Sequence, residues 1–263
     1  MFYDIIILGV DIMTRYYCSG FDINNAFGHG LGSMFLNELK NTKSIVYIPG
    51  GADKMQKVRD KYVPIFTEHF KNVGIQFENS TIIDPTMSQV EAQKAVREAS
   101  FIMLMGGNPF KQKELCEKLG LLEELKKYDG VMLGLSAGAM LMSKYIIITP
   151  CSEEYPHFHI EDGLNLDGIS IYPHNNTNQE DYPDTVVVGG ETYRKTDLIK
   201  VASEYGKFYL LQDFQREDGL FDISIIKSSN GNIEYYTEND GKIWLTTPDE
   251  IKITNSVEKT VNK

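Results

Sequence analysis

Short apolar runs alternate with helix-like segments over the first 150 residues. The runs predict strands at residues 5–8, 44–49, 75–83, 101–105 and 131–135. Helical patterns lie between them, at 33–39, 54–72 and 88–99 and in a stretch rich in Lys, Glu and Leu that leads toward Tyr128. Ser88 and Glu91 form a capping box at the start of one helix. The alternation is typical of an α/β fold, a mostly parallel central sheet with helices on both faces.

The pattern changes beyond residue 150. Strands are predicted at 169–172 and 208–211, and a helix at 191–204. Residues 219–253 alternate in period two and carry the turn signals Ser-Asn-Gly at 229–231 and Asn-Asp-Gly at 239–241, which predict β-hairpins at one edge of the sheet. We see no repeat or linker that divides the chain. We therefore predict one domain over 1–263, with a core at 1–215 and a C-terminal β-hairpin extension at 216–263.

Composition narrows the classes of function. A formal net charge of −11 argues against a nucleic-acid or anionic-membrane partner. We see no apolar run long enough for a transmembrane helix, and the apolar N-terminus carries Asp4 without a basic lead, so we interpret it as a strand and not a signal peptide. Cys18, Cys116 and Cys151 form no CxxC pair and are typical of reduced thiols. We expect a cytoplasmic protein.

The most informative motif is G-x-S-x-G, with Ser136 between Gly134 and Gly138. The apolar run Val131-Met132-Leu133 precedes it and small residues follow, which favours a sharp strand-to-helix turn over a chance match. Such a turn exposes the serine hydroxyl. It also directs the Ala137 N–H, at a helix N-terminus, toward the charge that develops when the serine attacks a carbonyl.

A second glycine turn follows the strand at 101–105 and reads Gly106-Gly107-Asn108-Pro109. Ligands of open parallel sheets bind at the carboxyl ends of the strands. One interpretation is a tight connection with Pro109 at the first helical position. The other makes the Gly107 N–H a second donor to the oxyanion. The two are compatible.

A nucleophilic serine needs a histidine and usually a carboxylate. His174 follows a predicted core strand directly, which would hold it at the end of the sheet. The other histidines are weaker candidates: His29 in a glycine-rich loop, His69 in a helical pattern that we expect to be solvated, and His157 and His159 in a loop pair with too few neighbouring ligands for a metal.

For the carboxylate, Asp213 ends the predicted strand at 208–211, while Glu217 and Asp218 follow in a charged turn and stay open as alternatives. The chain order is then serine, histidine, acid. An α/β-hydrolase has its acid before its histidine, and no histidine follows His174, so that fold is disfavoured. Asp162 or Asp167 would restore that order only by crowding the acid and the histidine into a very short segment.

Several of these motifs together resemble the serine peptidases of family S51, which include aspartyl dipeptidase (peptidase E) and cyanophycinase and whose fold is similar to the class I glutamine amidotransferases. The resemblance lies in Gly106-Gly107-Asn108 with Phe110, in Gly134 to Ala139, in Pro173-His174, and in Gly190-Glu191-Thr192. Amidotransferase relatives carry cysteine at the turn, so Ser136 argues against glutamine hydrolysis.

The resemblance implies a triad of Ser136, His174 and an acid, an oxyanion hole from the N–H groups of Gly107 and Ala137, and no metal or organic cofactor. The family pattern at the acid looks like Leu-Pro-Glu-Gly, whereas residues 211–214 read Leu-Gln-Asp-Phe. Asp213 is our candidate. The segment 151–162 also differs from the dipeptidase, which carries an implicated aspartate there, and Glu153 or Glu154 stay open as substitutes.

We expect a serine peptidase that cleaves short peptides near a free N-terminus. A preference for N-terminal aspartate requires a cation, for which Arg194 and Lys195 lie near the matching helix start, and Asn108 is a further candidate for substrate contact. The altered acid motif also allows a catalytically silent relative that binds a small molecule or partner, and the serine allows an esterase or acyl transferase. The predicted C-terminal hairpins could complete an interface or cover the site, so a homodimer is a further hypothesis.

Overall fold

The computed structural model describes residues 13–22, 24, 27, 30–176, 184–246 and 251–254. The strand predicted at 5–8 and His29 lie outside the described residues. The first described strand is β1 (Thr14–Cys18), whose five residues are all buried. The sequence pattern did not predict this strand, because Arg15 interrupts the apolar run. The Arg15 guanidinium is buried because it pairs with the Asp167 carboxylate at 3.0 Å.

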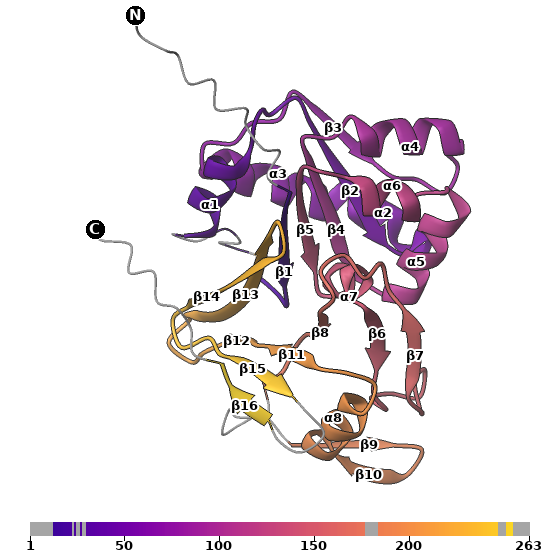
Figure 1. Ribbon diagram of the computed structural model, residues 1–263, viewed down its shortest axis with the longest axis vertical. Coiled ribbons are helices and arrows are strands. Elements are labelled where there is room, and N and C mark those ends of the chain that lie inside the picture. The colour runs from indigo at the N-terminus through magenta and orange to yellow at the C-terminus, as the bar shows by residue number, and fades with distance from the viewer. Residues whose placement is uncertain are drawn as a thin grey trace, which may run out of the picture.

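In the part of the chain that the structure describes, the central sheet has eight strands, and five of them are parallel neighbours in the order β1-β5-β4-β2-β3 (Figure 1). The other four parallel strands are β2 (Ser44–Gly50), β3 (Asn79–Ile82), β4 (Phe101–Gly107) and β5 (Val131–Leu135). The predicted segment at 75–83 therefore shrinks to four paired residues. The strands predicted at 44–49, 101–105 and 131–135 are confirmed.

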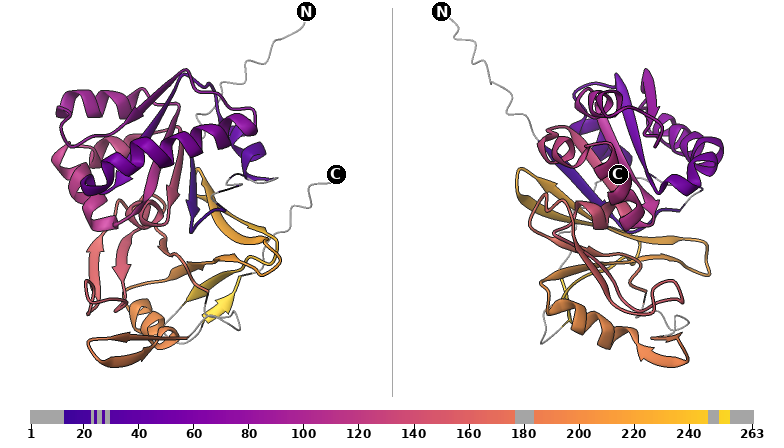
Figure 2. Two further views of the ribbon diagram at one scale, coloured as in Figure 1. Left: turned by 180° about the vertical axis from the view of Figure 1, so that it is seen from behind. Right: turned by 90° about the vertical axis from the view of Figure 1, so that its right-hand side faces the viewer.

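Helices cover both faces of this sheet, as predicted (Figure 2). They are α1 (Leu31–Glu38), α2 (Met55–Lys57), α3 (Val63–Asn72), α4 (Gln89–Arg97), α5 (Pro109–Lys118), α6 (Leu122–Lys127) and α7 (Ala137–Met142). A 3₁₀ turn, η1 (Ala52–Lys54), precedes α2, and a π turn, η2 (Val58–Tyr62), joins α2 to α3. The segment predicted as a single helix at 54–72 is therefore a helical segment that combines 3₁₀, α and π turns.

Alternate residues of the strands supply two separate cores. Along β4, Ile102 and Leu104 pack with α4 to α7, whereas Phe101 and Met103 pack on the other face with α1 and α3. Successive side chains of a strand point to opposite faces, which is why a continuous apolar run marks a strand buried on both sides. His69 was expected to be solvated, but it is 8% exposed, because α3 turns this residue toward the aromatic core.

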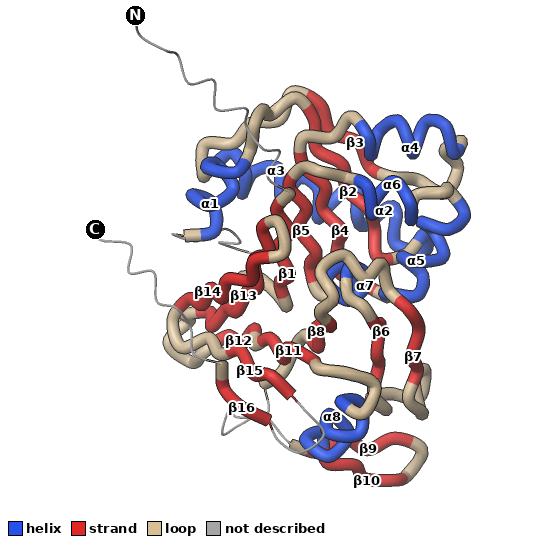
Figure 3. Tube along the Cα trace, viewed as in Figure 1, coloured by secondary structure: helices blue, strands red, loops and turns tan. Residues whose placement is uncertain are grey.

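A second sheet, in the order β16-β15-β11-β8, lies below the first in the view of Figure 3. Its strands are β8 (Ser170–Tyr172), β11 (Phe208–Leu211), β15 (Ile243–Thr246) and β16 (Ile251–Ile253). It packs with α8 (Lys195–Ser203) around Phe208, Leu210 and Trp244. The helix predicted at 191–204 is wrong over its first four residues, which form a strand.

Two antiparallel hairpins complete this half of the molecule. They are β6 (Tyr145–Ile148) with β7 (His159–Asp162), and β9 (Thr185–Val188) with β10 (Glu191–Arg194).

The C-terminal region forms one hairpin in the central sheet and then passes to the second sheet. The strands involved are β12 (Asp213–Gln215), β13 (Phe221–Ser229) and β14 (Asn232–Glu238). Asn230 and Gly231 have positive φ and close the β13–β14 hairpin as predicted, and β13 pairs with β1 inside the central sheet. The turn at 239–241 closes no hairpin. The chain passes there to β15, which pairs with β11, since Trp244 buries its ring in the core of the second sheet.

Among the described residues, no helix combines the length and apolar character needed to cross a bilayer.

The buried pair of Arg15 and Asp167 gives a test of this architecture. Replacing Arg15 by Met leaves the Asp167 carboxylate buried without its cation, so we expect the free energy of unfolding to fall by about 3–5 kcal/mol. Urea denaturation followed by circular dichroism measures it.

The matched control is Arg59→Met. The Arg59 side chain is 48% exposed where it meets Asp84, so its loss should cost less than about 1 kcal/mol. Equal effects of the two substitutions would contradict the role assigned to the buried pair.

Candidate active site

Ser136 occupies a strained turn between β5 and α7. Its φ of 50° and ψ of −104° lie outside the regions that a residue with a Cβ atom prefers. The flanking glycines permit this turn. A Cβ at Gly138 would lie 2.1 Å from the Leu104 carbonyl oxygen, and one at Gly134 would lie 2.7 Å from the Ala139 nitrogen. The turn holds the serine hydroxyl at the carboxyl edge of the sheet.

His174 lies within hydrogen-bond distance of Ser136. Its Nε2 is 2.7 Å from Ser136 Oγ, and its Nδ1 is 2.9 Å from each carboxylate oxygen of Asp213. A neutral imidazole with its proton on Nδ1 donates to Asp213 and accepts from the Ser136 hydroxyl. The His174 side chain is 50% exposed and that of Asp213 only 12%, so the carboxylate lies behind the ring, away from solvent.

Two pairs of parallel strands bring these groups together. β8 and β11 are parallel neighbours, with Tyr172 opposite Leu210, so His174 and Asp213 follow at adjacent strand ends. β1 and β5 are also parallel neighbours, with Cys18 opposite Leu135, so the residues that follow them are Ser19 and Ser136. Four strand ends from two sheets therefore meet at one place.

Asp213 is the carboxylate that reaches His174. Its approach depends on Gly20, because a Cβ there would lie 2.1 Å from Asp213 Oδ2. The alternatives lie elsewhere. Glu153 accepts a hydrogen bond from the Gly189 N–H at 3.1 Å, and Asp218 pairs with Arg216 at 2.9 Å. Glu154 and Glu217 have exposed side chains, and no contact joins either to His174 in the described part of the chain.

Sequence reasoning missed Ser19. Its side chain is fully buried, and its Oγ accepts a hydrogen bond from the His174 N–H at 2.6 Å and donates one to Asp213 Oδ1 at 2.9 Å. Ser19 therefore fixes both the backbone that carries the imidazole and the carboxylate that orients it. The available signal was a small polar pair, Ser19-Gly20, directly after a strand, but that strand was itself not predicted.

Ala137 directly follows Ser136, and Gly107 lines the same cavity as Ser136. Gly107 ends β4 with φ of 144°, and a Cβ there would lie 2.8 Å from the Gly50 carbonyl oxygen. This close approach, which only glycine allows, lets Gly107 line the same cavity as Ser136. Ala137 begins α7 directly after the serine, where the N–H groups of a first helical turn have no partner within the helix.

Ser136 and His174 lie between two hollows. A cavity of about 430 Å³, hereafter the larger cavity, extends toward α8. It is lined by Gly107, Pro109, Ser136, Met140, Ile147, Ile148, Thr149, Pro150, Cys151, Tyr172, Pro173, His174, Asn175, Val186, Lys195 and Ile199. A smaller one of about 200 Å³, hereafter the apolar hollow, is lined by Ser19, Gly20, Phe21, Phe66, Gly106, Leu135, Ser136 and His174.

The two basic residues that were candidates for substrate contact lie in different surroundings. Lys195 lines the larger cavity, and burial lowers the pKa of its ammonium group. The Arg194 side chain is 67% exposed and pairs with Asp184 at 3.4 Å, outside the described lining of that cavity.

Asn108 has a local structural task. Its Oδ1 accepts hydrogen bonds from the N–H groups of Phe110 and Lys111 at the start of α5, and its Nδ2 donates to the Tyr155 hydroxyl. Both polar ends of this side chain are thus engaged with the protein, and it lines a neighbouring surface hollow.

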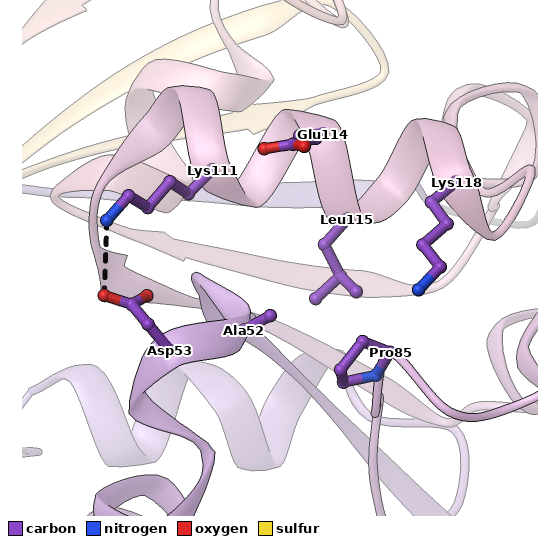
Figure 4. A pocket seen from close by; sticks show the side chains of 7 residues that line it. All are labelled: Ala52, Asp53, Pro85, Lys111, Glu114, Leu115 and Lys118. Atoms are coloured by element: carbon purple, nitrogen blue, oxygen red, sulfur yellow. Dashed lines mark hydrogen bonds and ion pairs between the residues drawn. The ribbon is translucent and has the colours of Figure 1, made fainter.

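Two other features lie apart from this site. A cavity of about 270 Å³ lies between α5 and η1, where Lys111 and Asp53 pair at 3.2 Å (Figure 4). Neither Ser136 nor His174 lines it. His159, one of the histidine pair, contacts Glu161 at 3.2 Å and the ring of Phe110. The described residues include no group of three or more side chains placed to hold a metal.

The fold and the row of serine, imidazole and carboxylate define a class, the α/β proteins with the side-chain arrangement of serine hydrolases. Within it, the model of peptidase family S51 matches residues 23–204, and the chain belongs to this family. Its membership places the protein among the peptidases.

Solved structures agree on the fold. A peptidase from an acI-B1 Actinobacterium aligns with a TM-score of 0.64 at 16% identity, over 94% of this chain and 96% of that one. A protein from Listeria monocytogenes EGD-e, described as a candidate peptidase E, aligns with a TM-score of 0.56 at 17% identity, over 87% of this chain and 100% of that one. Among curated proteins, none matches this sequence.

The position of Ser19 predicts that it acts through its neighbours. In Ser19→Ala the His174 N–H and the Asp213 carboxylate each lose a partner, so we expect the reaction of Ser136 with a serine-directed phosphonate to slow by about 10- to 100-fold. Mass spectrometry of the labelled peptide over time measures the rate.

Ser143→Ala is the matched control. Ser143 is equally buried and also bonds one backbone N–H and one acceptor, at Ile171 and Ala139, but it contacts neither His174 nor Asp213. It should lose similar stability and keep its labelling rate. Equal slowing in both variants would show that Ser19 has no role beyond packing.

Proposed function

We propose that the protein is a serine peptidase that hydrolyses short peptides and prefers an acidic residue at their free N-terminus. The observation that carries the proposal is the hydrogen-bonded row of Ser136, His174 and Asp213, which opens onto a cavity with Lys195 in its wall.

In the proposed reaction, Ser136 Oγ attacks the carbonyl carbon of the scissile bond while His174 Nε2 takes the hydroxyl proton. The Nδ1–H of the resulting imidazolium donates to Asp213, which stabilises its charge. The backbone N–H groups of Gly107 and Ala137 stabilise the oxyanion of the tetrahedral intermediate.

The second half of the reaction reverses these roles. The C–N bond breaks, and His174 gives its proton to the leaving amine. A water molecule then attacks the carbonyl carbon of the acyl-enzyme while His174 takes one of its protons. When this second intermediate collapses, the bond between that carbon and Ser136 Oγ breaks, and His174 returns the proton to Ser136 Oγ. The acid product and the free enzyme are released.

The larger cavity supports the substrate class. Its volume, about 430 Å³, suits a ligand of one or a few residues. Among the described residues, Lys195 is the one lysine or arginine in its lining, and no Asp or Glu lines it. Burial lowers the pKa of Lys195 and the nearby Asp184 carboxylate opposes that shift only in part, so a substrate carboxylate there adds a further charge-assisted contact.

The proposed triad predicts a graded loss of activity. Ser136→Ala should abolish release of amino acids from a dipeptide panel. Asp213→Asn should lower kcat by about 10³- to 10⁴-fold, because the imidazole is left without a stabilising anion and in the wrong tautomer. Chromatography of the released amino acids measures both.

Asp218→Asn is the control for Asp213→Asn, since Asp218 pairs with Arg216 away from His174. Wild-type turnover in Asp213→Asn would refute the role given to Asp213. A wild-type protein that cleaves no peptide, and whose Ser136 does not react with a phosphonate, would be a binding protein instead.

Lys195 predicts the side-chain preference. Lys195→Met should raise KM about 10- to 100-fold for peptides that begin with Asp or Glu and leave peptides that begin with Ala nearly unchanged, because only the acidic substrates lose a charged partner. Steady-state kinetics on matched peptide pairs provide the measurement, with Arg194→Met as the control that retains the preference.

The pH dependence of KM is an independent readout of the same residue. Burial lowers the pKa of Lys195, so the wild-type preference for acidic peptides should disappear as pH rises through that lowered pKa. In Lys195→Met the ratio of the two KM values should not change over this range. A preference that survives this substitution would exclude Lys195 as its source.

A further inference from the structure

We propose that the apolar hollow binds the side chain of the residue that follows the scissile bond, and that this residue is a large apolar one. The inference rests on the proposed function, since it assigns the second half of the same substrate.

The placement of the two hollows carries the first step. Of their described lining residues, the larger cavity and the apolar hollow have only Ser136 and His174 in common. A peptide bond under attack by Ser136 Oγ must lie at that boundary. Its two halves therefore extend to opposite sides, one into each hollow. If an acidic N-terminal residue lies beside Lys195 in the larger cavity, the next residue enters the apolar hollow.

The walls of the apolar hollow carry the second step. Phe21, Phe66 and Leu135 supply its large side chains. The hydroxyl of Ser19 is already bonded to His174 and Asp213, so it offers little to a polar ligand. In the described part of the chain, no lysine, arginine, aspartate or glutamate lines this hollow. A charged substrate side chain would lose water there without gaining a partner.

The aromatic walls of the apolar hollow pack on a shared neighbour, Phe27. Phe66 is 3% exposed, and its ring stacks on Phe27 with the centroids 6.3 Å apart. Phe21 meets the same Phe27 edge-on at 5.6 Å. An apolar side chain thus enters a preformed site and needs little reordering of the protein, which favours affinity.

Gly106 leaves the space next to the nucleophile open. A Cβ added at Gly106 would meet Leu135 O at 3.7 Å and Ser136 Cβ at 3.8 Å, both ordinary contact distances. Gly106→Ala is therefore tolerated by the backbone and occupies part of the hollow, so it reports on the fit of the second residue.

The test is a series of dipeptides with Asp first and Leu, Phe, Ala, Gly, Lys or Glu second, assayed by kcat/KM. Burial of a large apolar side chain predicts that the Leu and Phe peptides exceed the Gly peptide by about 10- to 100-fold. The Lys and Glu peptides should be no better than the Gly peptide.

Two variants make the test specific. Phe21→Lys places a cation in the hollow and should shift the ratio of the Glu peptide to the Leu peptide toward Glu by at least about 10-fold. Gly106→Ala should reduce the preference for Leu and Phe over Ala. Leu36→Lys is the control, because Leu36 is an apolar side chain on α1 that is 47% exposed and lies outside both hollows. The substrate preference of this variant should match that of the wild type.

The outcomes separate the two proposals. If peptides are cleaved with equal kcat/KM whatever the second residue, or if the apolar preference falls on the first residue, the assignment of the hollow is overturned while the peptidase stands. If no peptide is cleaved and Ser136 does not react with a phosphonate, the proposed function itself has failed. An apolar preference at the second residue that Phe21→Lys shifts toward Glu supports the assignment.

Discussion

The site depends on parallel pairing between strands that are far apart in the chain. β1 beside β5 places Ser19 next to Ser136, and β8 beside β11 places His174 next to Asp213. Parallel neighbours end at the same edge of a sheet, so each pairing delivers two side chains to one point. The site exists because the ends of one such pair, in the central sheet, meet the ends of another, in the second sheet.

This meeting requires close contact and local strain. Ser136 and His174 both have positive φ, which is uncommon for residues with a side chain. Glycines absorb the crowding around them, since Gly138 lies against Leu104 and Gly20 against Asp213. Strained backbone persists only where the surrounding structure holds it in place. Here the buried hydroxyl of Ser19 provides part of that hold through its bond to the His174 N–H.

The two hollows on either side of Ser136 differ in charge and in the side chains that line them. The protein has a net charge of −11, so its overall field repels an acidic substrate. A preference for such a substrate must come from a local cation, and among the described residues Lys195 is the one lysine or arginine that lines the larger cavity. The apolar hollow on the other side offers aromatic surface. A substrate that satisfies both halves carries unlike side chains on the two sides of the bond.

The sequence determined the parts of this protein that depend on neighbouring residues. Periodicity located most strands and helices, and the spacing of Gly134, Ser136 and Gly138 indicated the elbow, because a tight turn needs small residues at fixed positions. His174 and Asp213 stood out since each follows an apolar strand directly.

Only the tertiary structure decided the rest. β1 was missed because Arg15 becomes compatible with a buried strand through Asp167, which lies 152 positions away. Ser19 was missed with it. The turn at 239–241 resembles a hairpin, but the packing of Trp244 directs the following strand to the second sheet. Of the two neighbouring cations, Lys195 and not Arg194 lines the cavity, a choice set by how α8 packs. Such contacts join residues whose separation in the chain carries no local signal, and they form only when the two sheets come together.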